Sequence, residues 1–253
     1  MSRLDRELRS RRGPKAAVDP WRPLAAVTES ERRPGGRIES GRTLFLAGAE
    51  CPFTCVFCDL WRHTLDGPTP EGALPRQIEM GVGAGDPAWR WVKLYNASNF
   101  FDPRAVPAAD HRAIARAVER FPLVVVESHP RLLGDPCRRF ADLLSGRLEV
   151  ALGLETVHPR ALAALNKKLD LARYDAAVDW LRGEGIAVRA FVLLGAPFVP
   201  SAEQEEWTVA SVRHALAGGA GSVSIIPVRG GGELDRVARS GDFTPPTLEL
   251  AER

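Results

Sequence analysis

This sequence lacks any long hydrophobic run and any strong imbalance of charge. No apolar stretch approaches the roughly 20 residues that span a membrane, so we do not expect a transmembrane helix. The chain carries 34 basic and 32 acidic side chains, a net charge of +2 that does not favour a nucleic acid partner. Cysteine is scarce, and no export segment is evident, so we expect a reducing, cytoplasmic location. Hydrophobic residues make up 45% of the 253 positions, enough for one domain with a sizeable core.

Three of the four cysteines lie in one short segment, Cys51-Pro-Phe-Thr-Cys55-Val-Phe-Cys58. Three thiolates on one loop can hold three corners of an iron–sulfur cube and leave one iron open for a small molecule. A structural zinc ion needs four ligands; His63 is available as the fourth, but the spacing is not that of paired Cys-x2-Cys zinc sites. A disulfide would leave one cysteine over. The pattern therefore favours a [4Fe–4S] cluster on Cys51, Cys55 and Cys58, shielded by the ring of Phe57.

Short apolar runs alternate with helical patterns from residue 42 onward. The strand candidates are Thr43–Ala47, Trp91–Tyr95, Leu123–Glu127, Leu148–Leu152, Ala187–Leu194 and Ser222–Val228. Their continuous Val, Leu and Ile content is typical of parallel strands that are buried on both faces. Six βα units fit either an open α/β sheet or part of a barrel, and in both folds ligands gather at the carboxyl ends of the strands. The cysteine segment follows the first strand, at that end.

The ends of the chain differ from this body. Residues 1–40 contain ten basic and six acidic side chains and four prolines, which predicts a basic, Pro-rich extension. We expect this extension to hold no strand and to be dispensable, unless Trp21 packs across an open side of the fold. Residues 41–240 would form the core domain, and 241–253 a short C-terminal tail. Cys137 shares a helical face with Phe140, which predicts a core residue.

The cysteine segment resembles the signature of the radical S-adenosylmethionine (radical SAM) superfamily, Cys-x3-Cys-x-aromatic-Cys, at every position. The resemblance covers roughly residues 42–240 and is closest to the branch with the Elongator catalytic subunit and the oxygen-independent coproporphyrinogen oxidases. It implies an α/β fold, a partial (βα)6 barrel of parallel strands with the cluster at their carboxyl ends. It also implies an enzyme that reductively cleaves S-adenosylmethionine at the cluster, making a 5′-deoxyadenosyl radical that acts on an organic substrate. A reductase of the flavodoxin or ferredoxin type would supply the electron.

The resemblance extends to candidate contacts for S-adenosylmethionine. Asn96, Ser98 and Asn99 follow the second strand, where the family binds the amino group of the cofactor; a turn with Asx-type hydrogen bonds is the alternative. Glu155 and Lys167 have the twelve-residue spacing of a Gln and an Arg that contact the cofactor in the related branch. A surface lysine is the alternative for Lys167.

Further candidates end the third, fifth and sixth strands. Glu127 and His129 end the third and would face cofactor or substrate. Gly195 stands in a Gly-Ala-Pro turn that resembles the Gly-Leu-Pro turn near adenine in the same branch. Arg229 and the glycines at 230–232 could receive an anionic substrate.

Two other functions stay open. One is a tRNA-modifying member of the same branch, which the near-neutral body and the absence of an appended RNA-binding domain weaken. The other is a non-catalytic iron–sulfur protein that kept the cysteine loop. The sequence identifies neither the substrate nor a catalytic side chain.

Overall fold

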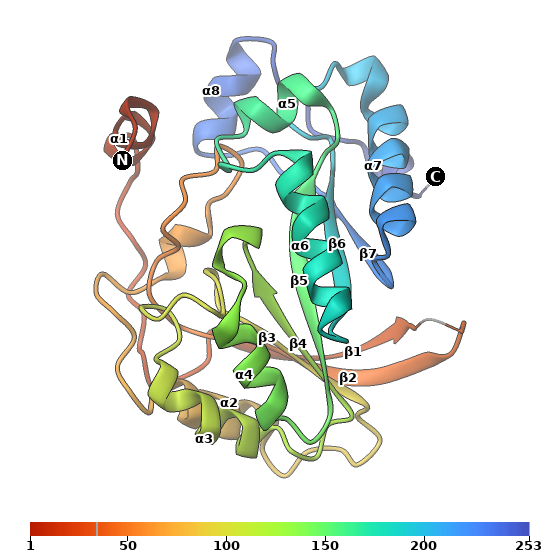
Figure 1. The fold of residues 1–253 in the computed structure, drawn as a ribbon. Coiled ribbons are helices and arrows are strands. Elements are labelled where there is room, and N and C mark those ends of the chain that lie inside the picture. The colour runs from red at the N-terminus through yellow and green to blue at the C-terminus, as the bar shows by residue number, and fades with distance from the viewer. Residues whose placement is uncertain (34, 253) are drawn as a thin grey trace.

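A computed structural model describes residues 1–33 and 35–252, and a seven-stranded curled sheet runs through it (Figure 1). The strands are β1 (Ala25–Arg32), β2 (Ile38–Phe45), β3 (Trp91–Tyr95), β4 (Leu123–Ser128), β5 (Arg147–Glu155), β6 (Ala187–Leu194) and β7 (Ser222–Pro227). They are neighbours in chain order; β2 to β7 run parallel, and β1 is antiparallel to β2. The sheet forms a half-barrel, so the predicted partial barrel with six parallel strands is confirmed.

Helices lie along the outside of this sheet (Figure 1). Those between the strands are α2 (Ala73–Val82), α3 (His111–Ala117), α4 (Asp135–Leu143), α5 (Pro159–Ala164), α6 (Leu171–Gly183) and α7 (Gln204–Gly218). Near the ends of the chain are α1 (Arg3–Ser10), which lies apart from the sheet, α8 (Glu233–Arg239) and α9 (Leu248–Glu252). The main core packs between sheet and helices, and both Cys137 and Phe140 are fully buried in it, as predicted. No helix of the described residues is long and apolar enough to cross a membrane.

The concave face of the sheet carries both apolar and charged side chains. Successive side chains of a strand point to opposite faces, and Trp91, Leu123, Val125 and Ala151 form a small apolar cluster on this side. Tyr95 and Phe191 pack against it, with ring centroids 6.0 Å apart in an edge-on contact. Charged side chains interrupt this apolar cluster: Lys93 and Glu149 are level with Val125 in the strand register.

The expectation that residues 1–40 hold no strand is wrong. β1 pairs with β2 over its whole length, from Ala25 opposite Phe45 to Arg32 opposite Ile38. Glu31, near the tip of this hairpin, accepts hydrogen bonds from Lys93 and from Arg189 Nη2 at 2.9 Å. The sequence pattern did not reveal β1 because an edge strand needs only one half-buried face. Its segment Thr-Glu-Ser-Glu-Arg has the composition of a polar linker. Trp21 lies near the surface, 38% exposed.

Candidate functional site

The cysteine segment begins where β2 ends, at the carboxyl end of the half-barrel. We call residues 46–65 the cluster loop. Buried Gln77 of α2 fixes its start: Ala47 N donates to the Gln77 side chain at 2.8 Å, and Gln77 Nε2 donates back to Ala47 O at 2.9 Å. Thr69 Oγ1 accepts from Ala49 N at 2.9 Å. Because both backbone groups are satisfied by side chains, the chain can leave the sheet here without unpaired polar groups.

The three thiols of the cluster loop are free and partly buried. Burial raises the pKa of Cys51, of Cys55 and, to about 12, of Cys58. Cys55 lies close enough for the charges of Cys58 and Cys51 to raise its pKa further. The thiols lie on one loop, but among the described residues they are not gathered at one point.

The cysteine loop fits the two proposed metal groups unequally. Among the described residues, no three cysteine, histidine or acidic side chains are arranged to hold a single ion, and His63 is exposed. A four-iron cluster does not require that convergence, because each of its cysteines ligates a different iron. Three thiols on one anchored loop suit the cluster better than a tetrahedral zinc ion.

Asn99 connects the cluster loop to the ends of β3 and β4. Its Nδ2 donates to Cys51 Sγ at 3.2 Å, and its Oδ1 accepts from His129 N at 2.7 Å. The His129 ring stacks on Phe53 with centroids 3.9 Å apart, and its Nε2 lies 2.9 Å from Lys167 O. Sequence reasoning gave neither Phe53 nor the position of His129 in this stack. Asn99 thus holds Cys51 instead of facing open space.

Glu155 and Lys167 form a buried ion pair, with Lys167 Nζ 2.6 Å from Glu155 Oε1. Lys167 is only 8% exposed, so the alternative of a surface lysine is excluded. Burial opposes its charge, yet the carboxylate of Glu155 and the nearby thiols together outweigh burial and keep the pKa of Lys167 raised. Cys55 and Cys51 contribute in the same direction, which puts the ammonium group beside the cluster loop.

The backbone of β5 is shaped around this pair. The strand has an irregularity between Gly153 and Glu155, and Glu155 has a φ of +67°, a conformation that is costly for a residue with a side chain. A Cβ at Gly153 would lie 2.1 Å from Glu155 Oε1 and 2.4 Å from Lys167 Nζ. Only glycine leaves room for the ion pair at that point.

Glu127 ends β4 on the concave side of the same edge. Burial raises the pKa of Glu127 to about 7, even though its carboxylate accepts from Asn96 N at 2.9 Å and also from Ala97 N. Asn96 Oδ1 accepts from Ser98 N at 3.3 Å, the Asx-type turn that was the alternative. Asn96 Nδ2 and Ser98 Oγ are nevertheless buried without a hydrogen-bond partner among the described residues. Such orphaned atoms are expected where a polar ligand completes the site.

Two sequence candidates lie in apolar surroundings. Phe57 packs against the smaller core cluster that contains Leu8 and Leu234. Gly195 has a φ of +73°, and a Cβ there would lie 2.6 Å from Pro246 Cδ. Position 195 therefore requires glycine because Pro246 of the C-terminal segment packs directly against it. Contact of Gly195 with adenine remains a prediction.

Residues 1–16 clamp the cluster loop from outside, which no sequence signal indicated. Buried Asp5 of α1 accepts from Thr54 Oγ1 at 2.7 Å and from Asn166 Nδ2 at 2.9 Å. The Thr54 hydroxyl and the Asn166 amide hold the pKa of Asp5 well below its usual range. Glu50, which precedes Cys51, forms ion pairs with Arg9, Arg12 and Lys15 at 3.2, 2.6 and 3.0 Å.

Comparisons with known proteins give matches in structure only. No protein-family model matches the sequence, and neither does any curated protein. Coproporphyrinogen III oxidase (HemN) from Escherichia coli, a radical SAM enzyme, superposes with a TM-score of 0.55 at 12% identity, over 82% of this chain and 50% of its own. The archaeal Methanocaldococcus infernus Elp3 gives 0.53 at 15% identity, over 71% and 48%. Methylornithine synthase (PylB) gives 0.52 at 15% identity, over 73% and 54%.

The chain spans about half the length of these solved structures. Identities of 12–15% carry the fold and not the reaction. Two of the three, the coproporphyrinogen oxidase and Elp3, represent the branch that the sequence motifs indicated. This chain therefore has the half-barrel fold of the radical SAM enzymes.

Proposed function

We propose that this protein is a radical SAM enzyme. When bound, a [4Fe–4S] cluster and S-adenosylmethionine would together supply a one-electron cleavage that yields the 5′-deoxyadenosyl radical for an organic substrate. The observation that carries the proposal is the position of Cys51, Cys55 and Cys58 beside the buried Glu155–Lys167 pair, at the carboxyl end of this fold. Ligand sites of parallel α/β folds lie at that end.

The residues of the site have separable tasks in this proposal. Cys51, Cys55 and Cys58 hold the cluster, and Asn99 Nδ2 stabilises the thiolate of Cys51 by the hydrogen bond described above. Lys167 supplies a fixed positive charge for the cofactor carboxylate, and Glu155 keeps that charge in place.

Two further parts of the site would orient the cofactor and keep water out. Ser98 Oγ and Asn96 Nδ2, buried and unpartnered among the described residues, would complete the polar contacts. The stacked Phe53 and His129 rings shield one side of the loop.

The substrate would enter the concave side of the sheet, above Tyr95 and Phe191. A flavodoxin- or ferredoxin-type reductase would deliver the electron. A tRNA substrate is not favoured, because residues 41–253 carry 24 basic and 26 acidic side chains.

The test is anaerobic reconstitution followed by iron, sulfide and 5′-deoxyadenosine analysis. We expect about four iron and four sulfide per chain, with the broad absorbance near roughly 400 nm of such clusters, and 5′-deoxyadenosine release that requires dithionite. Cys55→Ala should abolish both, whereas Cys137→Ala, at a buried cysteine of the core, should retain both. Cluster binding without any S-adenosylmethionine cleavage would instead support a non-catalytic iron–sulfur protein.

A further inference from the structure

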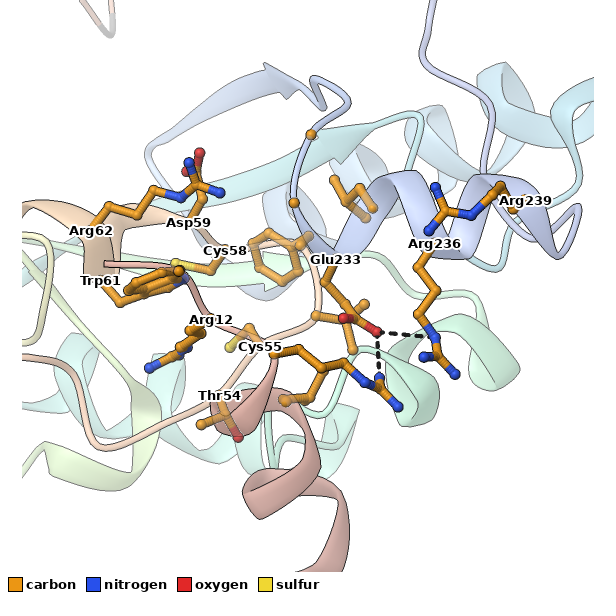
Figure 2. A pocket seen from close by; sticks show the side chains of 18 residues that line it. Arg12, Thr54, Cys55, Cys58, Asp59, Trp61, Arg62, Glu233, Arg236 and Arg239 are labelled. Atoms are coloured by element: carbon orange, nitrogen blue, oxygen red, sulfur yellow. Dashed lines mark hydrogen bonds and ion pairs between the residues drawn. The ribbon is translucent and has the colours of Figure 1, made fainter. Parts of the chain in front are cut away.

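A pocket of about 330 Å³ lies between α1, the cluster loop and α8, and the proposed reaction assigns it no task. Cys55 and Cys58 form part of its wall, but its lining does not include Glu155 or Lys167. Figure 2 shows Arg12, Trp61 and Arg62 on one side of it and Glu233, Arg236 and Arg239 on the other. The pocket therefore borders the site of the cluster without being part of the Glu155–Lys167 region.

The charge of this pocket is strongly positive. Five arginines line it (Arg11, Arg12, Arg62, Arg236 and Arg239), against two acids, Asp59 and Glu233. Glu233 is engaged by Arg11 at 2.8 Å and approached by Arg236 at 3.8 Å. Arg12 is held by Glu50 of the cluster loop. Within residues 1–33 and 35–252, Arg62 and Arg239 have no acid at ion-pair distance, so two guanidinium groups are left for an outside anion.

Arg62 is positioned for such a ligand. The guanidinium groups of Arg12 and Arg62 lie over the Trp61 ring, at 4.7 and 5.4 Å from its centroid. Stacking uses the face of a guanidinium and leaves its N–H edge for hydrogen bonds. Gly232 has a φ of +57°, and a Cβ there would lie 3.3 Å from Arg62 Nη2. The glycine turn before α8 thus lies close to Arg62, and a side chain at position 232 would make a tight contact with its guanidinium group.

We propose that this pocket binds an anion bearing one or more phosphate groups, with Arg62 and Arg239 as its main contacts. Guanidinium forks match the oxygen geometry of phosphate. The volume equals that of about ten liquid water molecules, which exceeds a single phosphate ion and leaves room for a second phosphate or an organic group. Binding needs neither the cluster nor S-adenosylmethionine, so the proposal stands or falls independently of the proposed function.

The experiment is calorimetric titration of the full-length protein, cluster-free and reconstituted, at low salt. Inorganic phosphate, pyrophosphate and ribose 5-phosphate are the probes. We expect saturable binding that weakens by roughly ten- to a hundredfold in Arg62→Gln and in Arg239→Gln, as for loss of a hydrogen bond to a charged group. Arg116→Gln, which removes the same charge from an exposed position on α3, should bind like the wild type. Gly232→Ala should also weaken binding, because its methyl group would crowd Arg62 without changing the charge.

The probes distinguish the sources of the phosphate. Tighter binding of ribose 5-phosphate than of the inorganic ions would identify a phosphorylated organic molecule as the ligand class, and equal affinities would identify the free ion. Absence of binding, or equal weakening in Arg116→Gln and Arg62→Gln, would overturn the proposal. Binding of an acidic flavodoxin that is lost in Arg62→Gln, with no binding of any phosphate, would overturn it in favour of a protein docking surface.

Discussion

Both ends of the half-barrel hold buried charges, but the charges are paired in different ways. At the amino end, Arg189 donates to Glu149 at 2.7 Å and to Glu31 at 2.9 Å, and Arg33 bonds the second oxygen of Glu149 at 2.9 Å. Lys93 joins the network through Glu31. Cations and carboxylates there pair across β1, β3, β5 and β6, although Arg33 Nη1 reaches Glu31 only at 3.5 Å and has no hydrogen-bond partner among the described residues.

At the carboxyl end the pairing is incomplete. Glu127 accepts from backbone N–H groups alone, and its pKa is raised. Asn96 Nδ2 and Ser98 Oγ are buried without partners among the described residues, and Glu155 has a strained backbone. Unsatisfied polar groups and strain cost stability, and proteins retain them mainly where a ligand or a reaction requires them. The comparison teaches that a buried charge alone does not indicate a functional site. A buried charge beside polar atoms that lack hydrogen-bond partners does.

The largest effect should follow removal of the hairpin that covers the amino end. Deleting residues 1–37 removes β1, Glu31 and the α1 clamp together, and exposes the charged network and the edge of β2. We expect insoluble or cluster-free protein, measured by size-exclusion chromatography and iron content. A soluble truncated protein that still cleaves S-adenosylmethionine would restore the original expectation that this segment is dispensable.

Arg189→Met should destabilise the protein by about 1–3 kcal/mol, because it leaves Glu149 Oε1 buried without a donor while Arg33 still holds the other oxygen. Urea denaturation of the cluster-free protein measures the change. The same substitution at exposed Arg116 should stay within about 0.5 kcal/mol of the wild type. A loss equally small at both positions would show that the amino-end network contributes nothing to stability.

Lys93→Met and Lys167→Met form a matched pair across the two ends. Lys167→Met should raise the dissociation constant of S-adenosylmethionine by roughly ten- to a hundredfold, because a charged hydrogen bond is lost. Lys93→Met should leave that constant unchanged in the folded protein, since its partner is Glu31 at the other end. Equilibrium dialysis of the reconstituted variants measures both dissociation constants. Equal affinities would show that Lys167 does not contact S-adenosylmethionine.

Asp5→Asn should alter the pH dependence of unfolding. The pKa of Asp5 is lowered in the folded protein, so its stabilisation is present above the unfolded value of about 3.9 and is lost as pH falls below it. The difference in unfolding free energy between wild type and variant should stay constant from pH 7 to about 4 and narrow as pH falls further towards the folded pKa. A difference that does not narrow below pH 4 would contradict a role for the Asp5 charge.

The smallest effect concerns Glu127, whose pKa is raised by burial to about 7. A raised carboxyl pKa stabilises the folded state at low pH, and that stabilisation fades as pH rises from about 4.3 through 7. The cluster-free wild type should therefore lose stability relative to Glu127→Gln over this interval. Carbon-13 NMR of the labelled carboxyl group should report the midpoint directly, and titration near 4.3 would refute the assignment.

The sequence predicted the parallel strands and the cysteine loop because both depend on local patterns: continuous apolar runs and three closely spaced cysteines. The half-barrel and the choice of Glu155 and Lys167 came only from the family resemblance, and the ion pair between these two residues was not predicted. The sequence did not predict β1, because polar edge strands have no distinctive hydrophobic period. The contact that holds its tip, between Glu31 and Arg189, joins residues 158 positions apart and leaves no local pattern. Nor did the sequence predict that Asp5 and Asn166 meet at Thr54, since hydrogen bonds over 161 positions leave no local signal.

The clamp on the cluster loop also sets the order in which the site can be assembled on the ribosome. Chains are synthesised from the amino end, so α1 and all three cysteines emerge long before Asn166, Lys167 and Lys168. Until those residues are made, Asp5 lacks the amide of Asn166 and the ammonium group of Lys168, whose Nζ lies 3.3 Å from Asp5 Oδ1, and the ammonium group of Lys167 is missing beside the thiols. A cluster delivered to the nascent chain would meet an unfinished loop. In the proposed enzyme, insertion of the cluster would therefore follow synthesis of at least the first two thirds of the chain.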